Sequence, residues 1–169
     1  WELLQLIRDR MEAQKQYFEP LAEGLRQARR RLEEKNRQPR PDAPDLRPVY
    51  ENPQLTPQKT PPELVYAPGK ETTLRGALGD VLGYLNKLTG GAFIAAAADL
   101  LSSTSVDKVA QGFPAGWFKA KDNPKARLIA IGGICEDAMG AMLSGLGNSG
   151  RHIGVGSSYG AFIAAMQHT

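Results

Sequence analysis

The first part of the chain shows a strict alternation of three- and four-residue steps between apolar positions. The series consists of Leu4, Ile7, Met11, Phe18, Leu21, Leu25, Ala28 and Leu32, with the polar Gln14 at one step. This period puts the apolar side chains on one face of a long amphipathic helix. Pro20 falls inside that helix, and its missing N–H and its ring predict a kink or a division into two helices.

This helix, residues 1–38, has two interpretations. The stripe suits a coiled coil, and it also suits a single helical arm packed on a neighbouring domain; we favour the arm. Most of the twelve prolines then lie within residues 39–70, among Gln, Asn, Thr and Asp. Because proline restricts its own φ and biases the preceding residue toward extended geometry, this segment is predicted to be an extended linker wrapped over a surface. A ligand of a signalling domain is the alternative.

Residues 71–169 show a different pattern, in which apolar strands and helices alternate. Thr72 and Thr73 are candidate N-caps for a helix whose apolar stripe ends at Gly90 and Gly91. Short apolar runs at 92–97, 127–131 and 153–155 are predicted strands, with helices after the second and third. This order predicts an α/β domain, a parallel sheet flanked by helices. In such sheets ligands bind beyond the carboxyl ends of the strands, where Asp99, Glu136 and Ser158 are expected.

Charge and composition argue against several classes of function. The formal net charge is +3, and the cluster Arg29 to Arg31 is followed by Glu33 and Glu34, which argues against a nucleic-acid surface. A single cysteine, Cys135, excludes an intrachain disulfide and a zinc cluster built on cysteines. The apolar runs are too short to span a bilayer, so we expect a cytoplasmic protein. Because the chain begins at Trp1 and its last helical pattern stops early, we expect a fragment truncated at its C-terminus.

Three motifs in the α/β region resemble the transketolase family. The most specific is Glu-Asp-Ala-Met-Gly-Ala at 136–141, after Gly133 and Ile134. The second is Ala-Asp-Leu at 98–100, which follows a predicted strand. The third is Thr-Leu-Arg at 73–75, which opens a helix. Their order and separation together are similar to the pyrimidine-binding domain of a thiamine-diphosphate-dependent enzyme.

The resemblance implies specific roles for several residues. Glu136 would be catalytic, hydrogen-bonding a ring nitrogen of the aminopyrimidine and so activating thiamine diphosphate. Asp99, Tyr159 and Phe162 would help to bind the cofactor, with the two rings packed on the aminopyrimidine. Arg75 and Ser103 would bind the phosphate of a sugar-phosphate substrate. Taken alone, Glu136 and Asp99 would be helix-end or turn acids, the two aromatics would be core residues, and Arg75 and Ser103 would be solvated.

The chain departs from the family at two neighbours of Glu136. Cys135 stands where the family has arginine, and Asp137 where it has histidine, so the substrate is less well defined than the cofactor. His152 and His168 match no catalytic histidine of the family and are interpreted as structural. The family's Gly-Asp-Gly…Asn motif, which binds the diphosphate and Mg²⁺, does not occur in this sequence. The resemblance therefore implies a homodimer, or a separate diphosphate-binding chain, and a fragment that is inactive alone.

The expected function is part of a transketolase-like transferase that moves a two-carbon ketol unit between sugar phosphates. Two alternatives stay open. One is the first component of a 2-oxo-acid dehydrogenase, which also uses a glutamate at this turn. The other is a catalytically silent transketolase-like assembly subunit.

Overall fold

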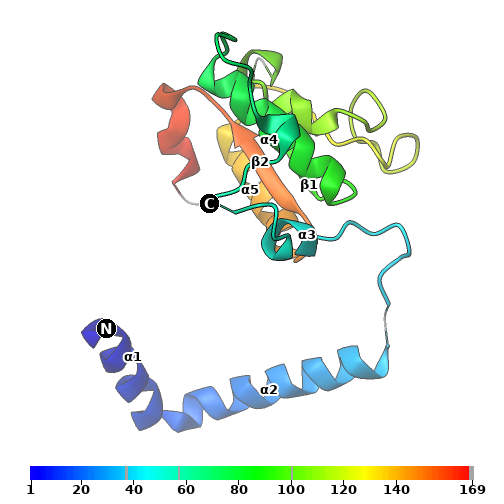
Figure 1. Ribbon diagram of the computed structural model, residues 1–169. Helices are drawn as coiled ribbons and strands as arrows, with labels where there is room; N and C mark the ends of the chain where they lie inside the picture. The colour runs from blue at the N-terminus through cyan, green and yellow to red at the C-terminus, as the bar shows by residue number, and fades with distance from the viewer. Residues whose placement is uncertain (37, 57, 100, 168–169) are drawn as a thin grey trace. The chain divides into compact units, whose positions relative to one another are not determined.

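The computed structural model describes residues 1–36, 38–56, 58–99 and 101–167 (Figure 1). The chain divides into two units, Trp1–Pro41 and Asp42–Thr169. The first unit holds two helices, and the second holds the sheet together with the candidate site. Each unit is described by itself below.

The first unit consists of α1, Glu2–Ala13, and α2, Lys15–Glu34. The expected division occurs, but its position at Pro20 was wrong: α2 continues through Pro20, and the break lies at Gln14, whose φ of −123° and ψ of 41° are not helical. The Gln14 N–H bonds the Met11 carbonyl, three residues back, at 3.2 Å, which ends α1. Pro20 lies near the start of α2, where its missing N–H removes only one helical hydrogen bond.

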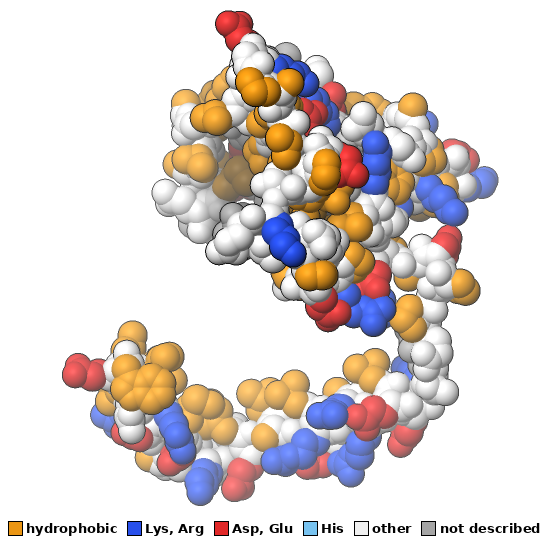
Figure 2. Space-filling model, viewed as in Figure 1, with side chains coloured by type: hydrophobic (Ala, Val, Ile, Leu, Met, Phe, Trp, Pro, Cys, Tyr) orange, Lys and Arg blue, Asp and Glu red, His pale blue; other side chains and the backbone are white. Residues whose placement is uncertain are grey.

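No side chain of α1 or α2 is buried. Figure 2 shows hydrophobic side chains gathered along one side of α2 and charged side chains along the opposite side. Ion pairs one helical turn apart join Arg8 to Glu12 and Arg29 to Glu33, each at 2.8 Å. Such exposed pairs stabilise a helix by a few tenths of a kcal/mol. The helical arm is therefore amphipathic, with its apolar side open.

The proline-rich segment of the second unit contains regular structure. α3 covers Arg47–Glu51, with Pro48 in its first turn, and η1 is a 3₁₀ helix at Pro62–Leu64. Proline suits a first helical turn because its missing N–H would have no partner there. Leu46 and Val49 pack against the core of the unit. This segment therefore follows a defined path, but it is not extended throughout, as the proline content had suggested.

The sheet of the second unit has two parallel strands, β1 at Phe93–Ala97 and β2 at Ile153–Ser157. The second predicted strand, 127–131, forms only isolated parallel bridges, in which Leu128 pairs with Ala95 and with Trp117. The Ala95 N–H bonds the Arg127 carbonyl, and the Ala95 carbonyl accepts from the Ile129 N–H, both at 2.9 Å. Because Ala95 uses both of its backbone groups here, β1 lies between β2 and this segment.

Helices cover both faces of the sheet. α4, Leu74–Leu88, begins where the Gly76 N–H donates to Thr73 Oγ1, and it packs with the 3₁₀ helix η3, Val106–Ala110. Phe93 and Ala95 of β1 join the cluster on this side. Ala96 joins a second cluster with Met139 and Leu143 of α5, which covers Glu136–Asn148. Neighbouring residues of a strand face opposite sides of the sheet, so the clusters that contain Ala95 and Ala96 lie on different faces. Helices therefore flank the sheet on both faces, and the predicted α/β arrangement is confirmed.

Two short elements complete the second unit. η2 is a 3₁₀ helix at Leu101–Thr104, and η4 is a 3₁₀ helix at Gly160–Met166. The helix expected after the third strand is thus present as a 3₁₀ helix. The residue before it, Tyr159, is in an extended conformation, with φ of −74° and ψ of 145°.

Candidate functional site

Glu136 is the buried carboxylate of the candidate site. It is the first residue of α5, and only 7% of its surface is exposed. The hydroxyl of Ser158, just beyond β2, donates to Glu136 Oε1 at 2.6 Å. The start of α5 and the end of β2 therefore meet through a short hydrogen bond between these two side chains.

A cavity of about 530 Å³ lies beside this hydrogen bond. Arg75 of α4, Ser103 of η2, and the consecutive residues Ser158 and Tyr159 all line it, so three different parts of the second unit meet there. The remaining lining is mainly apolar or backbone: Leu78, Leu82, Thr104, Val106, Val155, Gly156, Ser157 and Gly160. The structure thus brings the two predicted phosphate-binding residues to one cavity with a predicted cofactor residue, and Ser158 connects that cavity to Glu136.

Three further predicted residues lie outside the lining of this cavity. Asp99, two residues after β1, is exposed. Phe162 lies in η4 and is 48% exposed. Glu136 reaches the cavity only through Ser158, since its own side chain is not part of the wall. Tyr159 and Phe162 were expected on one face of an α-helix, but Tyr159 precedes a 3₁₀ helix.

The neighbours of Glu136 and the histidines are placed as follows. Cys135 and Asp137, the departures from the family pattern, are both exposed. His152 is half-buried, and its Nδ1 lies 3.2 Å from the Ala92 carbonyl oxygen. Burial lowers the pKa of His152, and the positive charge of Arg127 adds to this effect. His168 lies outside the described residues.

Two polar groups of the second unit were not singled out from the sequence. Asn86 is completely buried in α4 and hydrogen-bonds the backbone of two other segments. Asp80 accepts from Tyr66 Oη and from Lys108 Nζ, each at 2.6 Å, and these donors hold its carboxyl pKa below the ordinary value. In the sequence, Asn86 could have been recognised as a polar residue next to the apolar stripe of the predicted helix. The Asp80 cluster left no local signal, because its members lie far apart in sequence.

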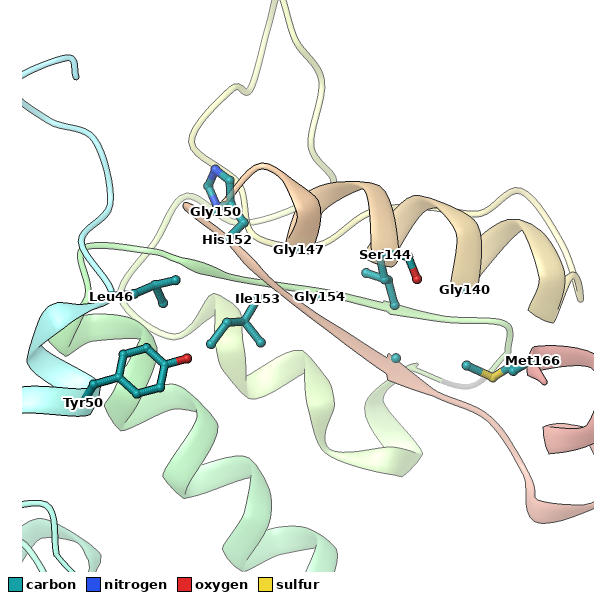
Figure 3. A pocket seen from close by; sticks show the side chains of 12 residues that line it. Leu46, Tyr50, Gly140, Ser144, Gly147, Gly150, His152, Ile153, Gly154 and Met166 are labelled. Carbon is teal, nitrogen blue, oxygen red and sulfur yellow. The ribbon is translucent and has the colours of Figure 1, made fainter. Parts of the chain in front are cut away.

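Two other cavities occur in the second unit. One, of about 490 Å³, is lined by Tyr50 of α3, Ser144 of α5 and His152 (Figure 3). Gly154 of β2 lies along its wall between α3 and α5 in this view. The other, of about 710 Å³, is lined by polar and aromatic side chains that include Tyr66 and Lys70. Neither contains the residues predicted for cofactor or phosphate binding.

Within the described ranges, no three or more His, Cys, Asp or Glu side chains are grouped in a way that could hold a metal ion. No helix in that part of the chain is both long and apolar enough to cross a membrane. Neither a protein-family model, nor a curated protein, nor a solved structure matches this chain. The candidate site is therefore interpreted from its own geometry and chemistry.

Proposed function

We propose that this chain is the pyrimidine-binding part of a transketolase-like, thiamine-diphosphate-dependent enzyme. The observation that carries the proposal is the buried Glu136 carboxylate at the start of α5, linked by Ser158 to a cavity that Arg75 and Ser103 also line. The proposed fold is the pyrimidine module of the thiamine-diphosphate-binding fold. Its supporting feature is a parallel sheet with helices on both faces.

The residue types at this site suit the aminopyrimidine of the cofactor. One hydroxyl fills only part of the acceptor capacity of a carboxylate, so Glu136 could also accept from a protonated ring nitrogen that reaches it beside Ser158, although its side chain does not line the cavity itself. Tyr159, on the cavity wall, offers a ring face for stacking, and Phe162 follows it one 3₁₀ turn later. Asp99 is proposed to approach the cofactor from the end of β1. When bound, thiamine diphosphate supplies the carbon centre that stabilises a carbanion.

The chain's own groups would then perform two tasks. Glu136 holds the ring nitrogen and shares a proton with it, while Ser158 keeps the carboxylate oriented. Arg75 offers a planar guanidinium for two parallel hydrogen bonds to a substrate phosphate, and Ser103 offers a hydroxyl. These two groups favour a sugar phosphate over a 2-oxo acid, because a 2-oxo acid such as pyruvate has no phosphate to engage them.

The proposal requires that another domain or chain bind the diphosphate and Mg²⁺. We propose that a second copy of the protein or a separate diphosphate-binding chain completes the site. A cytoplasmic location belongs to the same proposal and is supported by the single cysteine, which suits a reducing compartment.

The test is ketol transfer from xylulose 5-phosphate, with this chain supplied together with a diphosphate-binding domain, thiamine diphosphate and Mg²⁺. Glu136→Gln is expected to lower kcat by about 10²- to 10⁴-fold, because the variant cannot share a proton with the ring nitrogen. Deuterium exchange at cofactor C2, followed by NMR, should slow in parallel. The control is Asp137→Asn, the exposed neighbouring acid, which should keep activity.

The outcomes separate the alternatives. Decarboxylation of pyruvate without ketol transfer would indicate the 2-oxo-acid dehydrogenase component. Cofactor binding without any C2 exchange in the wild-type protein would indicate a silent assembly subunit. Unchanged exchange in Glu136→Gln would remove the catalytic role of that residue.

A further inference from the structure

The apolar side of the first unit is flanked by charges of a single sign. In α2 the apolar series Phe18, Leu21, Leu25, Ala28 and Leu32 advances in alternate steps of three and four, so it forms a narrow seam of the coiled-coil kind. We call this series the arm seam. The charged residues beside it, at the positions that flank a partner helix in a coiled coil, are all basic: Lys15, Arg29 and Arg31. The other flanking positions are Tyr17, Ala22 and Gly24.

The acids of α1 and α2 all lie away from the arm seam. They occupy the outer positions of the repeat, at Glu2, Asp9, Glu12, Glu19, Glu23, Glu33 and Glu34. One of them bonds a flanking residue, since Arg29 pairs with Glu33. Lys15 and Arg31 are exposed, and neither has an ion pair among the described residues.

Within the first unit, no side chain of the arm seam is buried. Leu21 is 59% exposed, Leu25 is 64% exposed and Leu32 is 63% exposed. These are large aliphatic side chains on one side of a single helix, where Figure 2 shows the hydrophobic surface of α2. An apolar stripe of this extent marks an interaction surface, because its burial is the main source of stability for an amphipathic helix.

The flanking charges indicate which kinds of partner can cover the arm seam. A second copy of α2 in an antiparallel pair would place Lys15 opposite Arg29, and like charges there oppose association; in a parallel pair the basic flanks would meet no acidic side chain. An anionic membrane is also disfavoured. Basic and acidic side chains are equal in number between Glu2 and Glu34, so α1 and α2 together carry no net charge that would attract them to lipid. The seam is also narrower than the broad apolar face of an interfacial helix.

We propose that the arm seam docks against an apolar helix of a partner protein whose flanking positions are acidic. Lys15 and Arg31 then face carboxylates across the seam, while Leu21 and Leu25 fill the apolar centre of the contact. This proposal is independent of the cofactor site, because it uses residues of the first unit alone.

The test measures binding of the whole 169-residue chain to two designed peptides. Both are amphipathic helices of about four heptads with the same Leu and Ile seam. One carries Glu at every flanking position and the other carries Lys. Fluorescence anisotropy should show that the Glu peptide binds at least tenfold more tightly, and that its affinity falls as salt is raised from about 0.05 M to about 0.5 M.

Two matched double charge reversals test whether the preference for the Glu peptide depends on the flanking positions. Lys15→Glu with Arg31→Glu changes the flanks and should invert the peptide preference. Arg26→Glu with Arg30→Glu makes the same change in net charge away from the seam and should leave the preference intact. Leu21→Ser with Leu25→Ser should abolish binding of the Glu peptide. Circular dichroism of each variant establishes that the helices are retained.

Three results would overturn the proposal. The first is equal affinity for the Glu and Lys peptides. The second is self-association of the wild-type chain that Leu21→Ser with Leu25→Ser dissociates, measured by sedimentation. The third is binding to vesicles containing phosphatidylserine without binding to the Glu peptide.

Discussion

At the residue scale, Asn86 shows how one buried amide joins a helix to two other segments. Its Nδ2 donates to the Phe93 carbonyl at 3.0 Å and to the Val109 carbonyl at 2.6 Å. Its Oδ1 accepts from the Phe93 N–H at 2.7 Å. α4, β1 and η3 are thereby connected at one point, and all of these groups are removed from water.

Asn86→Ala is expected to lower the free energy of unfolding by about 2–4 kcal/mol, because it leaves buried backbone groups without their partners. Urea unfolding followed by circular dichroism measures this difference. Asn148→Ala, at the exposed end of α5, is the matched control and should change stability by less than about 0.5 kcal/mol. Equal effects of the two substitutions would contradict the role given to Asn86.

His152 predicts a dependence of stability on pH. Burial holds its folded-state pKa below the ordinary value of 6.5, the Arg127 charge lowers it further, and the Ala92 carbonyl partly opposes this. As pH falls through about 6.5, the unfolded chain therefore takes up a proton that the folded protein binds more weakly. The free energy of unfolding should decrease from that pH down to the folded-state pKa. Urea titrations at about pH 7.5 and pH 5.5 should show a smaller decrease in His152→Gln than in the wild type. An identical decrease in both proteins would exclude this residue as the source.

At the element scale, α5 and β2 approach each other closely enough to require glycine. A Cβ added at Gly154 would lie 2.6 Å from both the Leu143 carbonyl oxygen and the Leu143 Cβ. Backbone atoms cannot yield as the end of a flexible side chain can. The glycine of β2 is therefore what allows α5 to pack directly on the sheet and to hold Glu136 near Ser158.

Gly154→Ala is expected to destabilise the protein by about 1–3 kcal/mol, because the new methyl group overpacks this contact. Gly145→Ala is the control within α5, where no heavy atom lies within 4 Å of the added Cβ. That substitution should stabilise the protein by about 0.5–1 kcal/mol, since alanine favours a helix interior more than glycine does. Thermal unfolding of the two variants should give shifts in Tm of opposite sign, and shifts of the same sign would contradict this account of the interface.

Local elements were predictable where the hydrophobic period was continuous. The pattern from Leu74 predicted α4, and the apolar runs at 92–97 and 153–155 predicted β1 and β2. The break in the first helix was placed at the wrong residue, because Pro20 was given more weight than the polar Gln14. The run at 127–131 forms only isolated bridges, from Leu128 to Ala95 and to Trp117. Its composition favours a strand, but a strand also needs a neighbouring strand in register along its length.

At the scale of the whole molecule, the two units differ in how much of their surface they bury. α1 and α2 contain no buried residue, whereas α4, β1 and α5 contribute to hydrophobic clusters. Helical stability in proteins comes mainly from burial of an apolar face. The helices of the first unit should therefore open more readily than those of the second.

Native-state hydrogen exchange tests this difference. Amides of α2 are expected to exchange at least about 100-fold faster than those of α4 and β1, because their opening exposes little additional apolar surface. Leu25→Ser should leave exchange in β1 unchanged, whereas Val109→Ala, in the core, should accelerate it. Equal protection of α2 and α4 would contradict the prediction.

The sequence by itself determined the local elements. It predicted a helix at 74–88 and the position of Glu136 just after a predicted strand, because these features depend on hydrogen bonds and periodicities within a few residues. Arg75 and Ser103 as candidate phosphate ligands follow only from the resemblance to the transketolase family. The roles of Glu136, Arg75 and Ser103 remain predictions for the ketol-transfer assay.

Only the tertiary structure decided which of these groups meet. It joined Glu136 to Ser158 across 22 residues of sequence and placed Arg75 and Ser103 on one cavity with Tyr159. It also left Asp99 exposed and outside the lining of that cavity. The physical reason is that distant contacts follow from how α4 and α5 pack on the two faces of the sheet, which depends on side-chain volumes and on close approaches such as that at Gly154.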